Sequence, residues 1–108
     1  LQQRSADLFL GLPYDIAMYG LLLEMLAKGA LMTPRRLIIS LGDCHIYNNH
    51  LDQVKEQLSR NIKQLPKVKL GCGIFERDDK LILPKKEDVM LFDYNPHKPI
   101  KAKLSVGT

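Results

Sequence analysis

The sequence predicts a fold of the α/β or α+β class, in which helices layer against a mixed β-sheet. Segments with helical spacing alternate with short strand-like segments, in the order strand, helix, strand, helix and then several strands. The chain has 108 residues, of which 45% are hydrophobic, and this is enough to build one core. Neither a repeat nor a low-complexity tract interrupts it, so one domain is expected.

The first strand and the first helix are expected to be joined by a tight turn. Residues 3–10 carry β-compatible side chains and lead to Gly11, which predicts a strand that runs into a turn. Pro13 suits the first position of a helix because the N–H that it lacks would be unsatisfied there in any case. Residues 16–26 are almost all apolar and Gly29 provides a stop, so this helix is expected to be covered on most sides.

A buried strand and a half-exposed helix are expected next. Residues 36–41 form a continuous apolar run of strand length, which is typical of a central strand with both faces buried. Asn49 can cap a helix that ends near Arg60. The apolar residues on one face of that helix are Leu51, Val54 and Leu58.

Three further strands are predicted in the rest of the chain. Polar and apolar side chains alternate over residues 67–70 and 100–104, and a short apolar segment covers residues 81–83. Each of these strands is expected to have one face in water.

The charge of the chain favours a small anion over a nucleic acid as ligand. Sixteen basic and twelve acidic residues give a net charge of +4, spread over the whole length. A loose basic cluster consists of Lys67, Lys69, Lys85 and Lys86. Because no aromatic residues are interleaved with these lysines, we interpret the cluster as a solvated face and expect no nucleic-acid partner.

Residues 8–27 form the longest stretch of low charge. Asp15 and Glu24 interrupt it, so a membrane span is not expected. Cys44 and Cys72 lack the spacing of a CxxC motif, and no secretory signal is present, which predicts reduced thiols and a cytoplasmic location.

Two segments carry groups suited to chemistry. Arg4 and Ser5 pair a guanidinium with a hydroxyl, a combination that suits phosphate oxygens. Cys44 and His45 are adjacent, so in a strand they point to opposite faces and cannot form a nucleophile and base pair. The spacing from His45 to His50 fits no recurrent zinc pattern, and no metal site is expected. The polar segment between these histidines is typical of a binding loop.

Taken together, four motifs resemble the C-terminal portion of thymidylate synthases and of the related phage-type deoxypyrimidine hydroxymethylases. They are QRSAD (residues 3–7), FLGLPYDIAMY (9–19), GDCHIYNNH (42–50) and YNPHKPIKAKLSV (94–106). The resemblance covers nearly the whole chain and is weakest over residues 70–89. It implies that residues 1–108 form the C-terminal part of a single catalytic domain with an incomplete, thymidylate-synthase-like mixed sheet.

The resemblance implies a one-carbon transferase. Members of the family use 5,10-methylenetetrahydrofolate as cosubstrate, modify carbon 5 of a deoxypyrimidine monophosphate and form homodimers. Carried over to this sequence, Arg4 and Ser5 would hold the substrate phosphate, and His45 and Tyr47 would hydrogen-bond the 3′-hydroxyl of the deoxyribose.

The folate side of the site is implied by two further residues. Asp7 would face the pterin ring, where a carboxylate can accept hydrogen bonds from a ring N–H and an amino group together. Gly11 would allow the backbone to approach the ligand closely.

Asp15 departs from the synthase pattern, which has asparagine at this position. An asparagine side chain complements uracil, whereas a carboxylate accepts from the 4-amino group of cytosine and stabilises a protonated N3 in the covalent adduct. This departure predicts hydroxymethylation of deoxycytidylate, with deoxyuridylate as the second choice of substrate. The alternatives are a thymidylate synthase acting on deoxyuridylate, and a structural role for Asp15 in the first turn of a helix, where the dipole favours an acid.

The second departure concerns the nucleophile. In the family it is a cysteine in a Pro-Cys-His motif upstream of the QRS segment, and this motif is not among the 108 residues. Cys44 aligns with a small or hydroxylic residue and is no substitute. We therefore expect the chain alone to lack turnover, and an inactive remnant that only binds nucleotide or dimerises is the remaining alternative.

Overall fold

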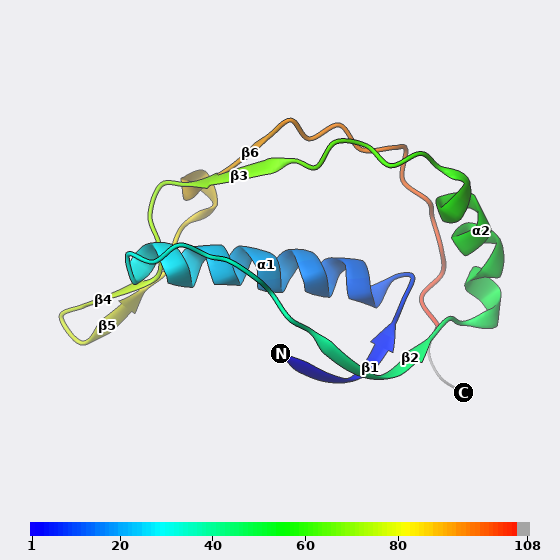
Figure 1. Cartoon of the computed structure of the whole chain (residues 1–108), viewed down its shortest axis with the longest axis horizontal. Helices are drawn as coiled ribbons and strands as arrows, with labels where there is room; N and C mark the ends of the chain where they lie inside the picture. Colours follow the sequence, from blue (N-terminus) through cyan, green and yellow to red (C-terminus); the bar gives the residue numbers. More distant parts are fainter. Residues whose placement is uncertain (106–108) are drawn as a thin grey trace. The chain divides into compact units, whose positions relative to one another are not determined.

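The computed structural model describes residues 1–105, and its helices and small sheets confirm the α+β class (Figure 1). In chain order the elements are β1 (Gln2–Asp7), α1 (Gly11–Gly29), β2 (Ser40–His45), the 3₁₀ helix η1 (Asn48–His50), α2 (Leu51–Ser59), β3 (Lys67–Leu70), β4 (Phe75–Arg77), β5 (Lys80–Ile82), the 3₁₀ helix η2 (Lys86–Asp88) and β6 (Val89–Phe92). Within the described part of the chain, the strands form three two-stranded sheets in place of the single mixed sheet that was expected.

The chain divides into two compact units. Among the described residues, the first consists of Leu1–Ala17, Ile38–Lys63 and 96–105, and the second consists of Met18–Leu37 and Gln64–Asn95. The buried side chains of the first unit are Ala6, Phe9 and His50, and those of the second are Ala27 and Leu70.

Parallel pairing of β1 with β2 organises the first unit. Gln2 pairs with Ser40 at one end and Asp7 with His45 at the other. The intervening connection contains α1, so strand, helix and strand follow the usual βαβ order for parallel strands (Figure 1). Gly42 lies so close to β1 that a Cβ atom there would be 2.5 Å from the carbonyl oxygen of Arg4. A glycine is therefore required at this point of the pair.

The predicted boundaries of the first strand and first helix were only partly right. The strand ends at Asp7, three residues before the predicted end, because the Asp7 carboxylate turns the chain. The helix begins at Gly11, which makes Pro13 its third residue rather than its first. Its end at Gly29 is confirmed.

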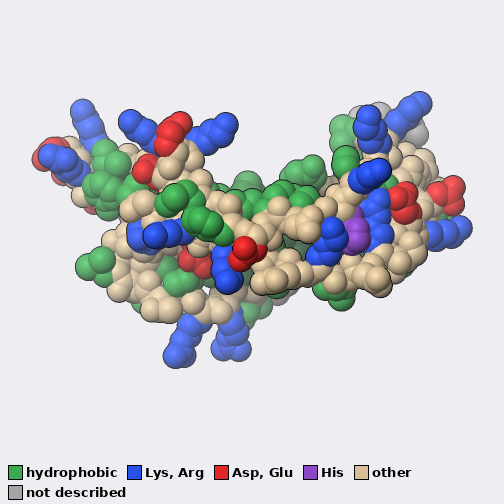
Figure 2. Space-filling model, turned by 90° about the horizontal axis from the view of Figure 1, so that it is seen from above, with side chains coloured by type: hydrophobic (Ala, Val, Ile, Leu, Met, Phe, Trp, Pro, Cys, Tyr) green, Lys and Arg blue, Asp and Glu red, His purple; other side chains and the backbone are tan. Residues whose placement is uncertain are grey.

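The expectation that α1 is covered on most sides was wrong for the described residues. Only Ala27 of this helix is buried, whereas Tyr14 is 77% exposed and Met18 is 54% exposed. Figure 2 shows hydrophobic side chains at the surface beside charged ones on the face in view. Residues 16–26 of α1 therefore carry many apolar side chains that are not buried within the described residues.

The strand predicted over residues 36–41 was also misplaced. The strand runs from Ser40 to His45, and Ile38 lies outside it with 66% of its surface exposed. Pairing with the polar β1 determines where a strand can form, because backbone N–H and C=O groups need partners. The apolar run before Ser40 has no strand partner in residues 1–105, so its hydrophobicity did not predict its structure.

The second helix was predicted correctly apart from its start. Helix α2 ends at Ser59, close to the predicted Arg60. Its N-cap is His50 and not Asn49, because η1 precedes it directly. The Asn49 side chain instead accepts a hydrogen bond from the Ser105 hydroxyl at 2.8 Å.

The second unit contains two antiparallel pairs, β3 with β6 and β4 with β5. The strand predicted over residues 67–70 is confirmed, and the one predicted over 81–83 starts one residue earlier. The sequence analysis missed β4 and β6. Asp78 and Asp79 both have positive φ angles, as a two-residue type I′ hairpin turn requires, so this pair of acids was an available signal for the β4–β5 hairpin.

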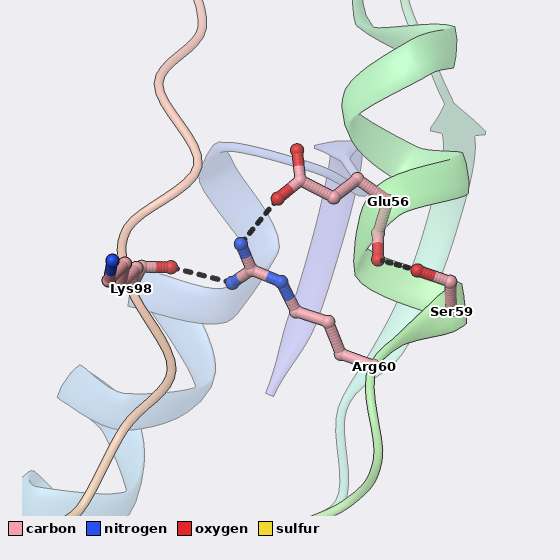
Figure 3. A network of polar contacts seen from close by, with 4 residues as sticks. All are labelled: Glu56, Ser59, Arg60 and Lys98. Carbon is pink, nitrogen blue, oxygen red and sulfur yellow. Dashed lines mark hydrogen bonds and ion pairs between the residues drawn. The ribbon is translucent and has the colours of Figure 1, made fainter.

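No strand forms over residues 100–104, contrary to prediction. The C-terminal segment, residues 96–105, is extended chain tied to the region around α2 by side-chain hydrogen bonds. The Arg60 guanidinium donates to the carbonyl oxygen of Lys98 at 2.6 Å and also contacts Glu56 (Figure 3). His97 contacts the carbonyl oxygen of Asn61 at 2.8 Å. These contacts hold the start of the segment beside the end of α2 without strand pairing.

The close approach at Gly42 generates a stability prediction. Gly42→Ala should lower the free energy of unfolding by about 1–3 kcal/mol, because the added methyl group collides with the Arg4 carbonyl and the strands must move apart. Gly20→Ala is the matched control, since a Cβ there meets nothing within 4 Å. The control should stabilise the helix by up to about 1 kcal/mol. Thermal unfolding followed by circular dichroism measures both, and equal effects would refute the requirement at Gly42.

Candidate functional site

Every residue that the sequence analysis assigned to a ligand lies in the first unit. Ser5 pairs with Asp43 and Asp7 pairs with His45 in the β1–β2 register. In a parallel pair both strands end at the same edge, and ligands bind at such carboxyl ends in α/β proteins. The pairing therefore brings together two motifs that are more than thirty residues apart in the sequence.

Arg4 and Ser5 are consecutive in β1, so their Cβ atoms point to opposite faces of the strand. Arg4 is exposed and Ser5 is half-buried. Both can contact one phosphate only if the flexible arginine stem bends around the strand edge. Within residues 1–105 neither side chain makes a hydrogen bond or an ion pair, so both donor groups are available to an anion.

Asp15 is held by a residue that the sequence analysis missed. The Gln3 amide nitrogen donates to Asp15 Oδ2 at 2.7 Å, which joins β1 to α1. Gln3 Oε1 is buried without a partner in the described part of the chain. Gln3 shares a strand face with Ser5 and Asp7, and this alternation was the available signal for it.

The alternative that placed Asp15 in the first turn of a helix was wrong. Asp15 is the fifth residue of α1, and the first turn contains no acidic residue. It therefore does not lie where the positive end of the helix dipole acts most strongly. Its carboxylate is half-buried and has one oxygen occupied by Gln3.

Asp7 has a structural task of its own. Its Oδ1 atom accepts hydrogen bonds from the backbone N–H groups of Phe9 at 3.0 Å and Leu10 at 3.3 Å. This Asx-type turn ends β1 and leads into α1. Because one oxygen is engaged, Asp7 Oδ2 is the atom available to a ligand donor.

His45 and Tyr47 lie together at the end of β2. Their ring centroids are 5.0 Å apart in an edge-to-face arrangement. His45 Nδ1 is 3.7 Å from Asp43 Oδ1, which is too long for a hydrogen bond, and it is buried without a partner in the described residues. The two side chains that the resemblance assigned to one hydroxyl group are thus neighbours.

Gly11 is not required by the fold. A Cβ atom there would meet Asp7 Cβ at 3.5 Å, which is an ordinary contact, and its φ angle is not positive. Its lack of a side chain therefore leaves room beside Asp7 without relieving any strain.

Both cysteines are free thiols. Cys44 is exposed in β2, adjacent to His45, and residues 1–105 hold no group of three or more side chains that could bind a metal ion. Partial burial raises the pKa of the Cys72 thiol; the hydrogen bond to Asp88 and the charge of Asp88 raise it further, while Lys28 lowers it. Cys72 is consequently a poor nucleophile at neutral pH.

In the described residues, no helix is long and apolar enough to cross a bilayer.

The Asx turn predicts a difference between two Asp7 variants. Asp7→Ala removes the acceptor for two backbone N–H groups and should cost about 1 kcal/mol, as the loss of a helix cap does. Asp7→Asn keeps an acceptor oxygen and should cost only a few tenths of this value. Urea unfolding of both variants measures the difference, and equal losses would mean that the turn does not depend on this oxygen.

The raised pKa of Cys72 predicts a pH-dependent reactivity. A raised pKa leaves less thiolate at a given pH, so Asp88→Asn should increase the rate of Cys72 alkylation by iodoacetamide at pH 8 several-fold. Glu87→Gln is the control, because this exposed neighbour is not among the groups that shift Cys72. Mass spectrometry of the Cys72 peptide gives the rates. Equal acceleration in both variants would indicate a general charge effect.

Comparison with known proteins agrees with the geometry. The profile of the family described as Thymidylate synthase matches residues 1–106. The chain is 48% identical over 106 residues to the thymidylate synthase of Malacoplasma penetrans, covering 98% of this chain and 35% of that protein. It is 49% identical to that of Francisella tularensis subsp. holarctica, covering 98% and 37%, and 44% identical to that of Saccharomyces cerevisiae, covering 98% and 34%.

The chain thus spans about a third of the length of these relatives, which are all named thymidylate synthase. The matched region includes the strands and loop that carry the candidate site. On this evidence the chain belongs to the thymidylate synthase family.

Proposed function

We propose that the protein transfers a one-carbon unit from 5,10-methylenetetrahydrofolate to carbon 5 of a deoxypyrimidine monophosphate, with deoxyuridylate as the acceptor. The observation that carries this proposal is the register of β1 with β2, which pairs the folate candidate Asp7 with the sugar candidate His45 at the carboxyl ends of the strands and leaves the phosphate candidate Ser5 two residues earlier on the same face of β1 as Asp7. The relatives are named thymidylate synthase, and this supports thymidylate as the product. They give no support to the hydroxymethylation predicted from the sequence, so the synthase alternative is the better one.

In the proposed site each end of the nucleotide has its own residues. Arg4 and Ser5 bind the phosphate through charge-assisted hydrogen bonds. His45 and Tyr47 bind the 3′-hydroxyl, and their edge-to-face contact supports a common target. The folate supplies the carbon unit. Asp7 Oδ2 accepts from the pterin, because Oδ1 is used by the turn.

Deoxycytidylate is a second candidate substrate, and Asp15 is the specific observation that favours it. An ionised carboxylate only accepts hydrogen bonds, and Gln3 already donates to Oδ2. The other oxygen can accept from the 4-amino group of cytosine. Uracil presents an oxygen at this position, which cannot donate to a carboxylate.

Competition between the two nucleotides tests the proposal. The full gene product, with whatever sequence flanks this chain, is supplied with the folate and with deoxyuridylate or deoxycytidylate labelled with tritium at carbon 5. We expect tritium release with kcat/KM higher for deoxyuridylate. Higher kcat/KM for deoxycytidylate would transfer the proposal to the second candidate, and binding of either nucleotide without any release would favour the inactive alternative.

Asp15→Asn separates the base from the rest of the site. The variant should raise kcat/KM for deoxyuridylate relative to deoxycytidylate by about tenfold or more. The reason is that an amide at position 15 can donate to the 4-oxygen of uracil, whereas the carboxylate acceptor for the 4-amino group of cytosine is lost. Glu24→Gln is the control, because it removes a carboxylate from the same helix at a position outside the candidate site. An unchanged substrate ratio in Asp15→Asn would remove the role of Asp15 in base choice.

We also propose that the protein acts as a homodimer. The apolar side chains exposed on α1, including Ile16 at 49% and Met18 at 54%, support burial of this helix against further protein. Sedimentation equilibrium of the full gene product should give twice the subunit mass, and a monomer at micromolar concentration would contradict the proposal.

A further inference from the structure

His50 has the most unusual environment of any polar residue in the first unit. Its side chain is completely buried, and it is the largest fully buried side chain of residues 1–105. The mechanism proposed above does not use it. A buried imidazole that touches neither substrate nor solvent needs a partner for each ring nitrogen, or a reason to lack one.

One ring nitrogen of His50, Nε2, has a hydrogen-bond partner in the C-terminal segment. Nε2 lies 2.8 Å from the carbonyl oxygen of Lys103, and a carbonyl oxygen only accepts hydrogen bonds. Nε2 therefore carries a proton and donates it to this oxygen. Nδ1 is buried without a partner among the described residues, so it gains nothing by holding the proton. The contact with Lys103 thus sets both the tautomer and the orientation of the ring.

The same ring packs against the candidate site. The His50 and Tyr47 ring centroids are 5.8 Å apart with an interplanar angle of 80°, and the His50 and Phe9 ring centroids are 5.4 Å apart. Tyr47 in turn packs edge-to-face on His45. Edge-to-face contacts depend on ring orientation, so a change at His50 passes to Tyr47.

The C-terminal segment reaches this cluster at two points. Besides the hydrogen bond from His50 to Lys103, the Ser105 hydroxyl donates to Asn49 Oδ1 at 2.8 Å. Both contacts come from side chains of η1, whereas Arg60 holds the same segment further upstream, at Lys98. His50 therefore contacts both the C-terminal segment and Tyr47.

We propose that His50 is a positioning residue that sets the orientation of Tyr47 for the nucleotide and ties the C-terminal segment to it. The positioning role rests on the proposed function, because it assigns Tyr47 to the deoxyribose. The tie to Lys103 is independent of any ligand. Two kinds of measurement therefore test the two parts separately.

Three variants of the full gene product separate the ring from its hydrogen bond. His50→Gln places an amide N–H where Nε2–H lies but removes the ring, and His50→Phe keeps a ring but removes the donor. His97→Gln is the control, because its Nε2 also contacts a backbone carbonyl but its ring lies outside the aromatic cluster.

Limited trypsin digestion measures the tie without a nucleotide. Lys101 and Lys103 are exposed, so cleavage after them reports how firmly the segment is held. His50→Phe should accelerate this cleavage about fivefold to tenfold, as expected for the loss of one buried hydrogen bond, whereas His50→Gln should accelerate it less. Cleavage as slow as in the parent protein for His50→Phe would overturn the tie.

A double-mutant cycle with Tyr47→Phe measures positioning. His50→Gln should weaken nucleotide binding about fivefold to tenfold in equilibrium dialysis when Tyr47 is present, and less than about twofold when its hydroxyl is absent. The control His97→Gln should leave the Kd unchanged. Additive losses would overturn the positioning role. If the parent protein bound neither deoxyuridylate nor deoxycytidylate, the proposed function and the positioning role would both fail, and the trypsin result would still decide the tie.

Discussion

The parallel pairing of β1 with β2 is the constraint on which the first unit depends. It aligns Asp7 with His45 at the carboxyl edge, and it is possible only because Gly42 lets the backbone of Arg4 approach. Parallel pairing places both strand ends at one edge and directs both following segments away from it. Two segments leave this edge: the Asx turn formed by Asp7 after β1, and the segment with Tyr47 after β2. The site is thus a consequence of one strand register.

Local signals predicted the elements whose ends depend on nearby residues. The end of α1 at Gly29, the end of α2 near Arg60 and the strand over residues 67–70 all follow from spacing within a few positions. The strand predicted over 36–41 failed because its limits depend on a distant partner. No strand forms over residues 100–104, where the Lys103 carbonyl oxygen is bonded by the His50 side chain and no strand of the described residues pairs with this stretch. Hydrophobicity indicates which residues can be buried, but pairing decides which are strands.

The residues of the candidate site were likewise predicted where a local motif identifies them, and missed where their role depends on a distant contact. Motif order identified Arg4, Ser5 and His45, since those residues lie in recognisable segments. Gln3 was not predicted as a site residue. Its role depends on a hydrogen bond from β1 to Asp15 in α1, twelve residues later, and residue spacing alone does not predict such a contact. His50 was considered as a metal ligand and as part of a polar binding loop, whereas its burial and its bond to Lys103 give it a structural task.

The contact between Gln3 and Asp15 explains how one side chain can determine the choice of base without a cost to the fold. A glutamine amide both donates and accepts, so after a rotation of the amide it can meet either a carboxylate or a carboxamide. Its Oε1 atom, now buried without a partner in the described residues, is the acceptor that an asparagine at position 15 would use. The pair therefore tolerates both residues, and the atoms of position 15 that face away from Gln3 are left to match the hydrogen-bonding pattern of the ligand.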